Sequence, residues 1–377
     1  MPVDFSRDVR CVLGLPFDSL TEAAAEAALR AAVRDRTRCF LSTPNLNFAI
    51  GCLNDTSFRD SVLSSDLNLA DGWPIVAVAR LLRSALPERV AGSSLFERLG
   101  RSSQRPPVAV YFFGGPEGAA EAACDRLNHA AGGVRCTGYQ TPGFGDIASM
   151  STAAQLDQIN AAKADFVVVA LGAKKGQAWI EHNLPRIEAP VVSHLGAVVN
   201  FTAGRLRRSP ISYQKLGLEW LWRIGQEPEL WRRYAHDAAA LSRLLVMRVL
   251  PYAVALHLRP AATADPSTTT VATEVSERRV VLRLSGAWQH ANLGAMRQTL
   301  QSILPIDRTV ALDASRVTGL DSAAVGLLAL LYGAAGKSGV GWQLLGASAE
   351  ARRAIRGVCA DYLLTNRPAA PPTRPVQ

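Results

Sequence analysis

The sequence predicts an α/β protein. We expect a Rossmann-like, mostly parallel sheet with helices on both faces, followed by a smaller α/β domain. The first observation is that short apolar runs alternate with alanine-rich runs of helical spacing up to about residue 200. The second is a polar, Pro-containing stretch after residue 260. The third is a new alternation that begins near residue 278 and predicts the second domain.

Apolar segments rich in β-branched and aromatic residues predict the strands of the first sheet. They are 39–43, 67–70, 108–113, 134–139, 165–171 and 190–195. Helical patterns lie between them, for instance at 20–35 and 117–131. In parallel sheets of this kind, ligands bind in the loops that follow the carboxyl ends of the strands.

Composition divides the chain into five segments. We assign 1–204 to the first α/β domain, 205–259 to a basic helical appendage, 260–277 to a linker, 278–366 to the second α/β domain and 367–377 to a disordered tail. In the second domain, strand patterns at 280–286, 308–315 and 341–346 alternate with helix patterns at 291–304, 322–338 and 348–364.

The positive charge of the chain is concentrated in the appendage. The net charge is +9, and residues 205–248 hold eight Arg and one Lys against three Glu and one Asp. Three Trp lie in the same window, a mixture that favours an anionic membrane surface or a polyphosphate. Nucleic acid is the alternative partner, but no recognition motif for it occurs. The apolar run 241–258 is too short and too charged to predict a membrane span, and we expect it to lie on a membrane.

Motifs of other chemistries are absent from the sequence. The six Cys have no C-x-x-C spacing, which argues against a zinc site or a secreted disulfide framework and favours buried thiols in a reducing cytosol. There is no D-x-D, H-E-x-x-H or G-x-S-x-G motif. We therefore expect no metal and no cofactor. The first residues lack the features of a signal peptide, which predicts a cytoplasmic protein.

A single carboxylate interrupts the apolar run LNLADGWPIVAVARLL. Asp71 lies where a predicted strand ends, and Pro74 fits the first turn of the helix that follows. One interpretation is a helix cap or turn residue, which such positions favour. The other is a catalytic carboxylate at the carboxyl end of the strand. Position alone does not decide between them.

Other candidate residues occupy loops that follow strands, except Arg89, which lies downstream of the helix after Asp71. Thr43 and Asn45 in TPNLN could hydrogen-bond a sugar or nucleotide, or form a turn held by the Asn side chain. Arg89 is either a surface Arg or a bidentate partner for a diphosphate. Gly114 and Gly172 precede helices, whose N-terminal N–H groups suit anions. Neither loop is a G-x-G-x-x-G or P-loop motif, so a nicotinamide oxidoreductase is not supported.

Taken together, these loops resemble the TagA/WecG/CpsF-type glycosyltransferases (glycosyltransferase family 26) of bacterial surface-polysaccharide synthesis. The resemblance covers about residues 10–237. It is carried by TPNLN, ADG, ERVAGSSL, LGAKKGQAWI, HLGAVVNFTAG and RRSPISYQKLGLEWLWRIGQEPELWRRY. The last is the most specific, because GLEW followed by EP and WRRY is hard to obtain by chance.

The resemblance implies inverting, metal-independent transfer from a UDP-sugar to a polyprenyl-diphosphate-linked sugar. It gives Asp71 the role of general base and Arg89 that of stabilising the diphosphate. It places seven residues in the substrate pocket, namely Thr43, Asn45, Gly114, Gly172, Lys175, Gln177 and Asn200. N-acetylmannosamine, its uronic acid and glucose are donor sugars among such enzymes, and the sequence does not choose between them.

The chain departs from the family pattern at several of these positions. The family usually has G-x-P-K-Q-E-x-W where this chain has GAKKGQAW. Lys174 therefore replaces Pro, Gly176 stands where Gln is expected, and Gln177 stands where Glu is expected. Asn200 and Ser94 stand where the family often has Asp. These differences concern the donor sugar more than the reaction type.

The resemblance also implies that appendage arginines close over the active site and meet the membrane. Arg223, Arg232 and Arg233 are the candidates, and a solvated basic helix is the alternative. We expect peripheral association with the anionic inner face of the bacterial cytoplasmic membrane through residues 205–258.

Residues 278–366 resemble a STAS domain, the fold of anti-sigma-factor antagonists. VVLRLSG and VALDASRVTGLDSAAVGLLALL carry the resemblance. In that family the first Ser of D-S-S-G at a helix start can be phosphorylated, and Asp321 and Ser322 match it, whereas Ala323 and Ala324 replace the second Ser and the Gly. A phosphate would be favourable at this helix N-terminus. The alternative is a capping Ser with only a docking role, and the protein partner is unknown.

Two functions from different classes follow. The first is a glycosyltransferase with a STAS-like regulatory or docking domain. The second is a non-catalytic, sugar-nucleotide-binding scaffold that acts through the STAS-like domain, and the altered GAKKGQ loop keeps this alternative open.

Overall fold

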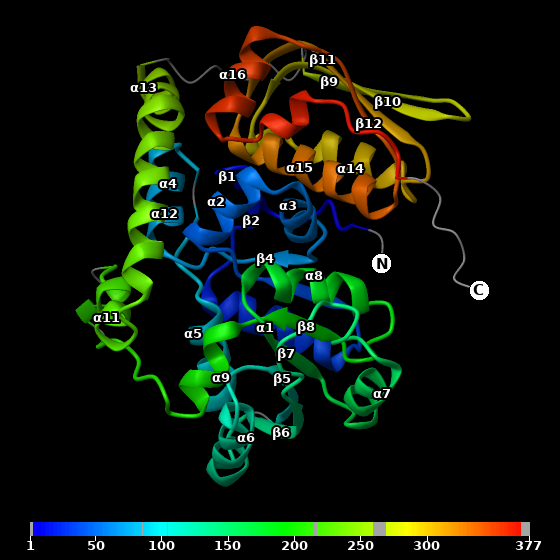
Figure 1. Ribbon diagram of the computed structural model, residues 1–377. Coiled ribbons are helices and arrows are strands. Elements are labelled where there is room, and N and C mark those ends of the chain that lie inside the picture. Colours follow the sequence, from blue (N-terminus) through cyan, green and yellow to red (C-terminus); the bar gives the residue numbers. More distant parts are fainter. Residues whose placement is uncertain are drawn as a thin grey trace.

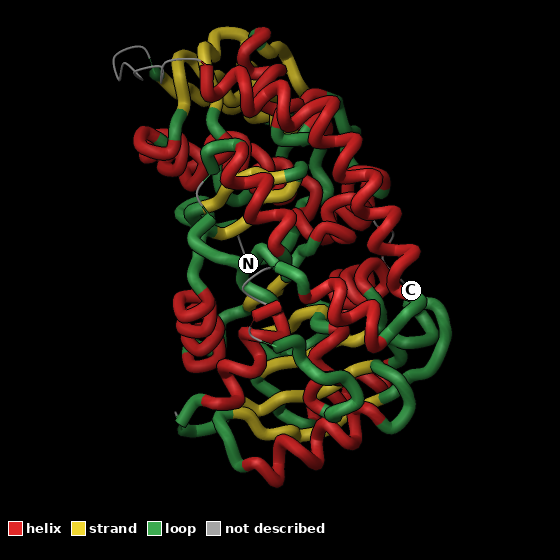
Figure 2. The backbone as a smooth tube through the Cα atoms, turned by 90° about the vertical axis from the view of Figure 1, so that its left-hand side faces the viewer, coloured by secondary structure: helices red, strands yellow, loops and turns green. Residues whose placement is uncertain are grey.

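The computed structural model describes residues 3–84, 86–103, 105–210, 212–213, 217–258 and 269–370. Figure 1 shows two α/β units stacked on one another, with a long helix along one side that reaches from the first unit to the second. Figure 2 shows the same two sheets from the side. The expected α/β architecture is confirmed.

The first unit is built on a six-stranded sheet of order β4-β3-β8-β7-β5-β6 in which every pair is parallel. Its strands are β3 (Cys39–Ser42), β4 (Leu67–Asn68), β5 (Val108–Gly114), β6 (Val134–Gln140), β7 (Phe166–Ala170) and β8 (Val191–His194). Each matches a segment predicted as a strand, although β4 is shorter than expected and β5 and β6 each extend one residue further.

Helices cover both faces of this sheet. They are α1 (Glu22–Arg34), α2 (Leu46–Asn54), α3 (Thr56–Leu63), α4 (Trp73–Leu81), α5 (Gly92–Arg101), α6 (Ala119–Ala130), α7 (Ala153–Ala161), α8 (Ala173–Asn183) and α9 (Gly196–Thr202). Alternate residues of a strand point to opposite faces, and β5 illustrates the result. Val110 and Phe112 join the core on one side, while Tyr111 and Phe113 join the core on the other.

A hairpin that the sequence pattern did not predict precedes this sheet. Strands β1 (Val9–Val12) and β2 (Leu15–Asp18) pair antiparallel and are buried throughout. Leu13 and Gly14 form the turn with positive φ at both positions, the geometry of a two-residue type I′ turn. The hairpin lies between the two units, so it has no polar face and hence no alternating pattern.

The second unit has a four-stranded sheet of order β12-β11-β10-β9. Strands β10 (Arg279–Trp288), β11 (Thr309–Leu320) and β12 (Trp342–Ala347) are parallel, and β9 (Thr270–Val275) is antiparallel to β10. The helices are α14 (Gly294–Ser302), α15 (Ser322–Lys337) and α16 (Ala349–Gly357), with short 3₁₀ turns at His290–Asn292 and Asp361–Leu364.

Two predicted segment boundaries differ from the structure. Strand β9 lies in residues assigned to the linker, because its small polar residues hide an edge strand that has only one neighbour in the sheet. At the other end, Arg367 pairs with Trp342 in a β-bridge although it was assigned to the disordered tail. Residues 260–268 of the linker and 371–377 of the tail lie outside the described residues.

The two units share one hydrophobic core. Helix α15 packs against β1, β2 and α3, and residues of both units belong to one buried cluster. A Cβ added at Gly333 would lie 2.6 Å from the Leu63 carbonyl oxygen, so the glycine permits this contact between backbones. Tyr362 donates a hydrogen bond of 2.9 Å to the carbonyl of Gly14. The contact between the units is therefore tightly packed.

The appendage contains α11 (Glu219–Gln226) and one continuous helix formed by α12 (Leu230–Leu244), a π-helical turn (Leu245–Val249) and α13 (Leu250–Leu258). Within the described residues, this helix alone is long and apolar enough to cross a membrane by length and composition. It spans more residues than the run 241–258 that was judged too short. Asn47 of α2 donates to Asp237 near one end of the helix, and Tyr252 packs on Gly357 of α16 near the other.

The cysteines differ in part from the expectation of free thiols. Cys11, Cys39, Cys52 and Cys359 are buried thiols, as expected. Cys124 and Cys136 instead form a disulfide between α6 and β6, with Cα atoms 5.0 Å apart. The packing of a helix on its neighbouring strand creates this proximity, and residue spacing does not reveal it.

Candidate active site

A cavity of about 960 Å³ lies at the carboxyl ends of the first sheet, below the appendage. We call it the substrate cavity. Its wall includes residues at or just after the ends of β3, β4, β5, β7 and β8, namely Thr43, Asp71, Gly115, Ala170 and His194. Residues of α11 and α12 close it from the other side. This is the edge of the sheet where ligands were expected.

Asp71 lies in this cavity and does not cap the helix after it. The N-cap residue of α4 is Gly72, and no side chain caps that helix. Burial raises the pKa of the Asp71 carboxyl to about 6, while the guanidinium of Arg89 opposes the shift. The nearby carboxylate of Glu219 raises this pKa further. Asp71 is therefore not the cap of α4, although its carboxylate accepts a hydrogen bond from the backbone of Gly92, the first residue of α5. A carboxylate with a pKa of about 6 suits a general base near neutral pH.

Arg89 lies in the same wall and is held by the appendage. Its Nη1 is 2.5 Å from Oε2 of Glu219, at the start of α11. Glu219 also lines the cavity, and residue-by-residue reasoning did not single it out. The signal was present, because Glu219 is the acidic residue of the GLEW motif. The motif thus connects the appendage to the residue expected to bind a diphosphate.

Thr43 and Asn45 also line the cavity. The Asn45 side chain accepts a hydrogen bond of 3.2 Å from the backbone of Phe48 and so caps α2. The alternative interpretation, in which the Asn45 side chain bonds the local backbone, is confirmed for its Oδ1 atom. The residue nevertheless forms part of the cavity wall. Thr43 follows β3 directly and is buried, so its hydroxyl has a fixed position beside the cavity.

The remaining predicted pocket residues divide into two groups. Gly172 and Asn200 line the cavity, whereas Gly114, Lys175 and Gln177 are not among the described residues of its wall. Lys175 donates to the carbonyl of Gly145 at 2.8 Å, and Gln177 is fully buried and donates to Ser42 at 2.6 Å. Helical geometry explains the split, because successive residues of α8 turn by about 100° and only its first turn faces the cavity.

The appendage arginines also differ in position. Arg223 and Arg233 line the cavity, whereas the guanidinium of Arg232 lies over the ring of Trp231, outside the described lining. Arg223 pairs with Glu227 at 3.0 Å, but its Nε is buried without a hydrogen-bond partner among the described residues. Arg207 and Arg208 add positive charge to the wall and were not predicted individually.

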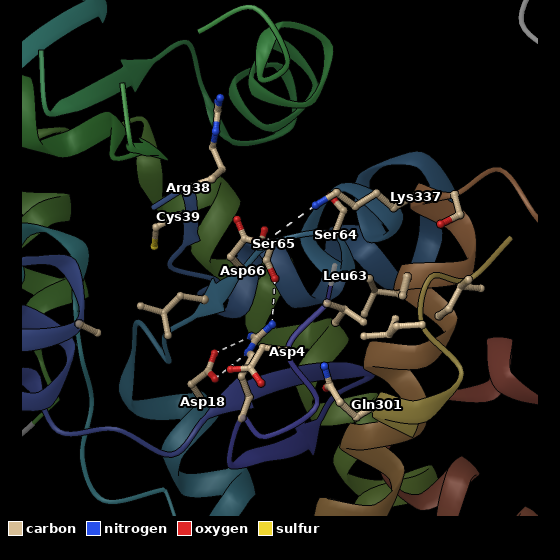
Figure 3. Close-up of a pocket in the computed structure, with 18 of the residues that line it drawn as sticks. Asp4, Asp18, Arg38, Cys39, Leu63, Ser64, Ser65, Asp66, Gln301 and Lys337 are labelled. Carbon is tan, nitrogen blue, oxygen red and sulfur yellow. Dashed lines mark hydrogen bonds and ion pairs between the residues drawn. The ribbon is translucent and has the colours of Figure 1, made fainter. Parts of the chain in front are cut away.

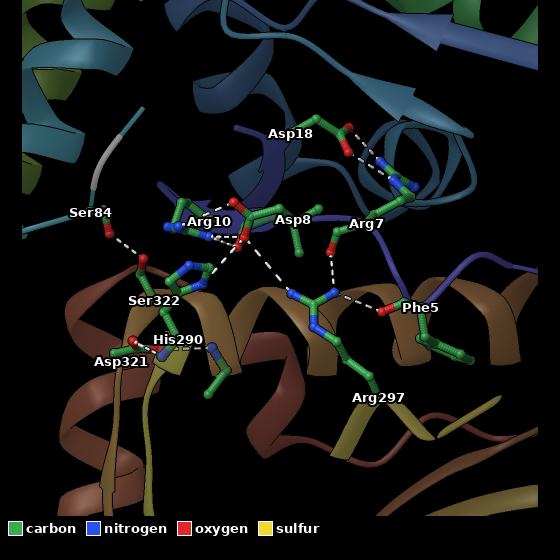
Figure 4. Close-up of polar contacts among 12 residues, drawn as sticks. Phe5, Arg7, Asp8, Arg10, Asp18, Ser84, His290, Arg297, Asp321 and Ser322 are labelled. Carbon is green, nitrogen blue, oxygen red and sulfur yellow. Dashed lines mark hydrogen bonds and ion pairs between the residues drawn. The ribbon is translucent and has the colours of Figure 1, made fainter. Parts of the chain in front are cut away.

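Ser322 does not line this cavity and lies at the contact between the two units (Figure 4). Its hydroxyl is hydrogen-bonded to that of Ser84 in the first unit, and the side chain is buried. Asp321, not Ser322, caps α15 by accepting from Ala324 at 2.8 Å. Ser322 therefore contacts the other unit of the same chain, and its phosphorylation stays a prediction.

Charged groups surround this contact. Asp8 of the first unit lies 2.5 Å from Arg10, and it also lies 3.3 Å from His290 and 3.8 Å from Arg297 of the second unit. Arg297 donates to the carbonyl of Phe5 at 2.8 Å. Figure 4 shows these side chains converging on Asp8. The second unit is thus held by polar contacts as well as by the shared core.

Known proteins resemble the part of the chain that forms the substrate cavity. The profile described as the glycosyl transferase WecG/TagA/CpsF family matches residues 10–253. This chain belongs to that family. It is a glycosyltransferase. The profile described as Mlab, STAS domain matches residues 271–365, which form the second unit. Within the described residues, no group of three or more His, Cys, Asp or Glu side chains is placed to hold a metal ion.

Three curated relatives share the name N-acetylglucosaminyldiphosphoundecaprenol N-acetyl-β-D-mannosaminyltransferase. The one from Bacillus spizizenii is 26% identical over 52% of this chain and 74% of its own length. That from Bacillus subtilis is 27% identical over 51% and 73%. One from Staphylococcus aureus is 21% identical over 59% and 85%.

A solved structure also resembles the second unit. It is an anti-sigma factor antagonist from Mycobacterium paratuberculosis, 22% identical, which covers 26% of this chain and 85% of its own with a TM-score of 0.23.

Proposed function

We propose that this protein transfers a sugar from a UDP-sugar to a sugar linked to a polyprenyl diphosphate, with inversion and without a metal. An N-acetylmannosamine-type donor is the first choice, because the curated relatives carry that activity in their names, and glucose is the second. The observation that carries the proposal is the position of Asp71, a carboxylate of raised pKa beside Arg89 at the carboxyl edge of the sheet.

In this mechanism Asp71 acts as the general base. It takes the proton of the acceptor hydroxyl while that oxygen forms a bond to the anomeric carbon of the donor. The bond from the anomeric carbon to the phosphate oxygen breaks at the same time, and UDP leaves with the electron pair. Attack from the face opposite UDP inverts the anomeric configuration.

Arg89 stabilises the charge of the departing diphosphate. Its guanidinium is paired with Glu219 in the structure. A diphosphate carries more charge than one carboxylate and matches the planar guanidinium well. Substrate binding would therefore draw Arg89 from Glu219, and the loosened α11 would bring Arg223 toward the substrate.

We propose that the appendage binds the enzyme to the inner face of the cytoplasmic membrane. The appendage exposes large apolar side chains, namely Trp220, Leu221, Trp231, Val246, Met247, Leu250, Val254 and Leu258. The helix that carries most of them is docked to both units, which favours a position on the bilayer over one across it. Replacing Val246, Met247 and Val254 by Ser should reduce sedimentation with anionic liposomes, and unchanged sedimentation would refute this assignment.

For the STAS-like domain, we propose that the transferase unit of the same chain is its main partner. The face of α15 that begins at Ser322 lies against the transferase unit. The domain also contacts the appendage helix through Tyr252 and through the ion pair of Arg248 with Asp361. It would thereby hold the helix that closes the substrate cavity.

Release of UDP tests the proposed function. The full-length protein is incubated with a lipid-diphosphate-linked sugar and a panel of UDP-sugars, and UDP is measured over time. Acceptor-dependent release with at least one donor is expected. No release with any donor would favour the alternative of a non-catalytic scaffold. Calorimetry would still detect the binding of UDP-sugars to such a scaffold.

A further inference from the structure

His194 is a residue of the substrate cavity that the sequence patterns did not single out. It ends β8, and its ring lies between α8 and α9 on the cavity wall. Its exposed fraction is only 8%. The ring of Phe48 lies at a centroid distance of 6.0 Å on the neighbouring α2. The imidazole thus packs against α2, α8 and α9.

The ring occupies the space above Gly176. A Cβ added at Gly176 would lie 2.2 Å from Cδ2 and 2.9 Å from Cγ of His194. No side chain fits at position 176 while the imidazole stays where it is. Gly176 stands where the family pattern has Gln. The chain therefore lacks the Gln side chain at this position, and the His194 ring occupies the space that this side chain would need. His194 brings a polar side chain into the region from which the change at position 176 removes one.

Two polar side-chain atoms in this wall lack partners. Nε2 of His194 is buried and has no hydrogen-bond partner within the described part of the chain, and the same holds for Oδ1 of Asn200. Burial lowers the pKa of the His194 imidazole to about 4, so the ring is neutral at physiological pH. Buried polar atoms without partners are rare in proteins, and in a cavity they indicate groups that bind a ligand.

We propose that His194, with Gly176 making room for it, is a donor-specificity residue that hydrogen-bonds a polar substituent of the hexose of the sugar nucleotide. The inference rests on the proposed function. The exposed apolar residues of the appendage suit the lipid-linked acceptor. The wall that contains His194 lies at the carboxyl edge of the parallel sheet, where nucleotides bind in folds of this kind. A small turn of the ring on binding would expose Nε2 to the cavity, and a hydroxyl or acetamido group of the hexose would then supply the partner that Nε2 lacks.

Two replacements separate the hydrogen bond from the volume of the ring. His194→Phe keeps a planar ring of similar size and removes both nitrogens, whereas His194→Gln keeps a hydrogen-bonding group. We expect His194→Phe to raise the KM for the preferred UDP-sugar about tenfold with kcat changed less than about threefold, which is the loss of one neutral hydrogen bond in binding. His194→Gln should recover most of the affinity. His182→Ala, an exposed His on α8, should match the wild type.

The contact with Gly176 provides a second and independent test. Gly176→Gln alone should lower kcat/KM about tenfold or more, because the new side chain displaces the imidazole. The double variant Gly176→Gln with His194→Gly removes the ring and restores the amide. We expect it to be more active than either single variant and to prefer a different UDP-sugar from the wild-type panel.

The outcomes distinguish this inference from the proposed function. If the wild-type protein releases UDP but His194→Phe shows the wild-type KM across the donor panel, the inference is wrong and the proposed function stands. An additive double variant would also contradict it, because two residues in contact should not act independently. If the wild type releases no UDP with any donor, the proposed function itself fails. Donor affinity measured by calorimetry then shows whether His194 still contributes to binding.

Discussion

Two large cavities of this molecule differ in how their polar side chains are paired. The substrate cavity has about 960 Å³, and a second cavity of about 840 Å³ lies between the transferase unit and the STAS-like domain (Figure 3). In the second cavity the side chains bond one another. Arg7 donates to Asp18 at 2.7 Å, and Lys337 lies 4.0 Å from Asp66. Arg38 donates to the carbonyl of Leu184 at 2.5 Å.

The substrate cavity also contains paired groups, such as Arg89 with Glu219, but it holds unpaired polar atoms as well. Buried atoms of His194, Asn200 and Arg223 have no partner among the described residues, whereas no described residue of the second cavity has such an atom. Asp71 is also held at a raised pKa by burial. Cavity size alone thus does not identify a site. Unpaired polar atoms distinguish the substrate cavity from the second cavity, and their desolvation is uncompensated until a ligand binds.

The largest expected effect tests this contrast directly. Asp71→Asn should lower kcat for UDP release by about 10²–10⁴-fold, the usual contribution of a general base. The matched control is Asp66→Asn in the second cavity, whose carboxylate accepts from the backbone of Phe40. That control should leave kcat within about twofold of wild type while lowering stability. Equal losses in the two variants would show that the pairing pattern does not mark the active site.

The second-largest effect on kcat is expected from replacing Arg89. Arg89→Gln should lower kcat by about 10²-fold, because it removes a positive charge from the departing diphosphate. Glu219→Gln, which removes only the partner of Arg89, should have a much smaller effect or increase the rate. If both variants lose activity equally, the ion pair rather than the free guanidinium is required.

The pH dependence follows from the raised pKa of Asp71. The base acts in its ionised form, so kcat/KM should fall about tenfold per pH unit below a pH of about 6 and level off above pH 7. The same shift predicts an effect on stability. A carboxyl whose pKa is raised in the folded state stabilises the fold at low pH and loses that contribution as pH rises through 6. Asp71→Asn should therefore raise Tm at pH 8 and leave it nearly unchanged at pH 4.

The sequence allowed prediction of the parts of the site that depend on local order along the chain. Asp71, Thr43 and Asn45 follow strands of a recognisable pattern, and the carboxyl ends of parallel strands meet at one edge. Arg89 lies between α4 and α5, and the family resemblance singled it out. His194 could not be found in this way. Its role depends on the fit of its ring against Gly176 of another helix, which no spacing records.

The same limit applies to the contact between the two units. The β1–β2 hairpin was missed because both of its faces are buried, and the position of Ser322 was misleading. A Ser at a helix start is the same motif whether it faces solvent or another domain. Only the packing of α15 on β1 shows that this face is already occupied.

That packing predicts a moderate effect on stability. Gly333→Ala would place a Cβ 2.6 Å from the carbonyl oxygen of Leu63, so a backbone must shift. We expect a loss of about 1–3 kcal/mol in the free energy of unfolding, measured by chemical denaturation. Gly294→Ala is the matched control, because nothing lies within 4 Å of a Cβ added there. If the two variants are equally stable, the units are less tightly packed than the structure shows.

The smallest effect concerns the ion pair between Arg248 of the appendage helix and Asp361 of the STAS-like domain. The two side chains are 42% and 40% exposed, so solvent screens the pair. Its contribution to the free energy of unfolding should not exceed about 1 kcal/mol. Arg248→Glu and Asp361→Arg should each lower kcat slightly, by loosening the helix that closes the substrate cavity. The double variant restores opposite charges and should recover the wild-type rate.

This charge reversal is informative despite its small size. A purely structural role of the pair would change stability and leave kcat unaffected, whereas recovery of kcat in the double variant requires the STAS-like domain to act on the cavity through the helix. Tyr252→Ala, which empties the contact with Gly357 in the same interface, should lower kcat more than either charge reversal because a buried aromatic contact is lost. A wild-type kcat in Tyr252→Ala would mean that the domain only stabilises the chain.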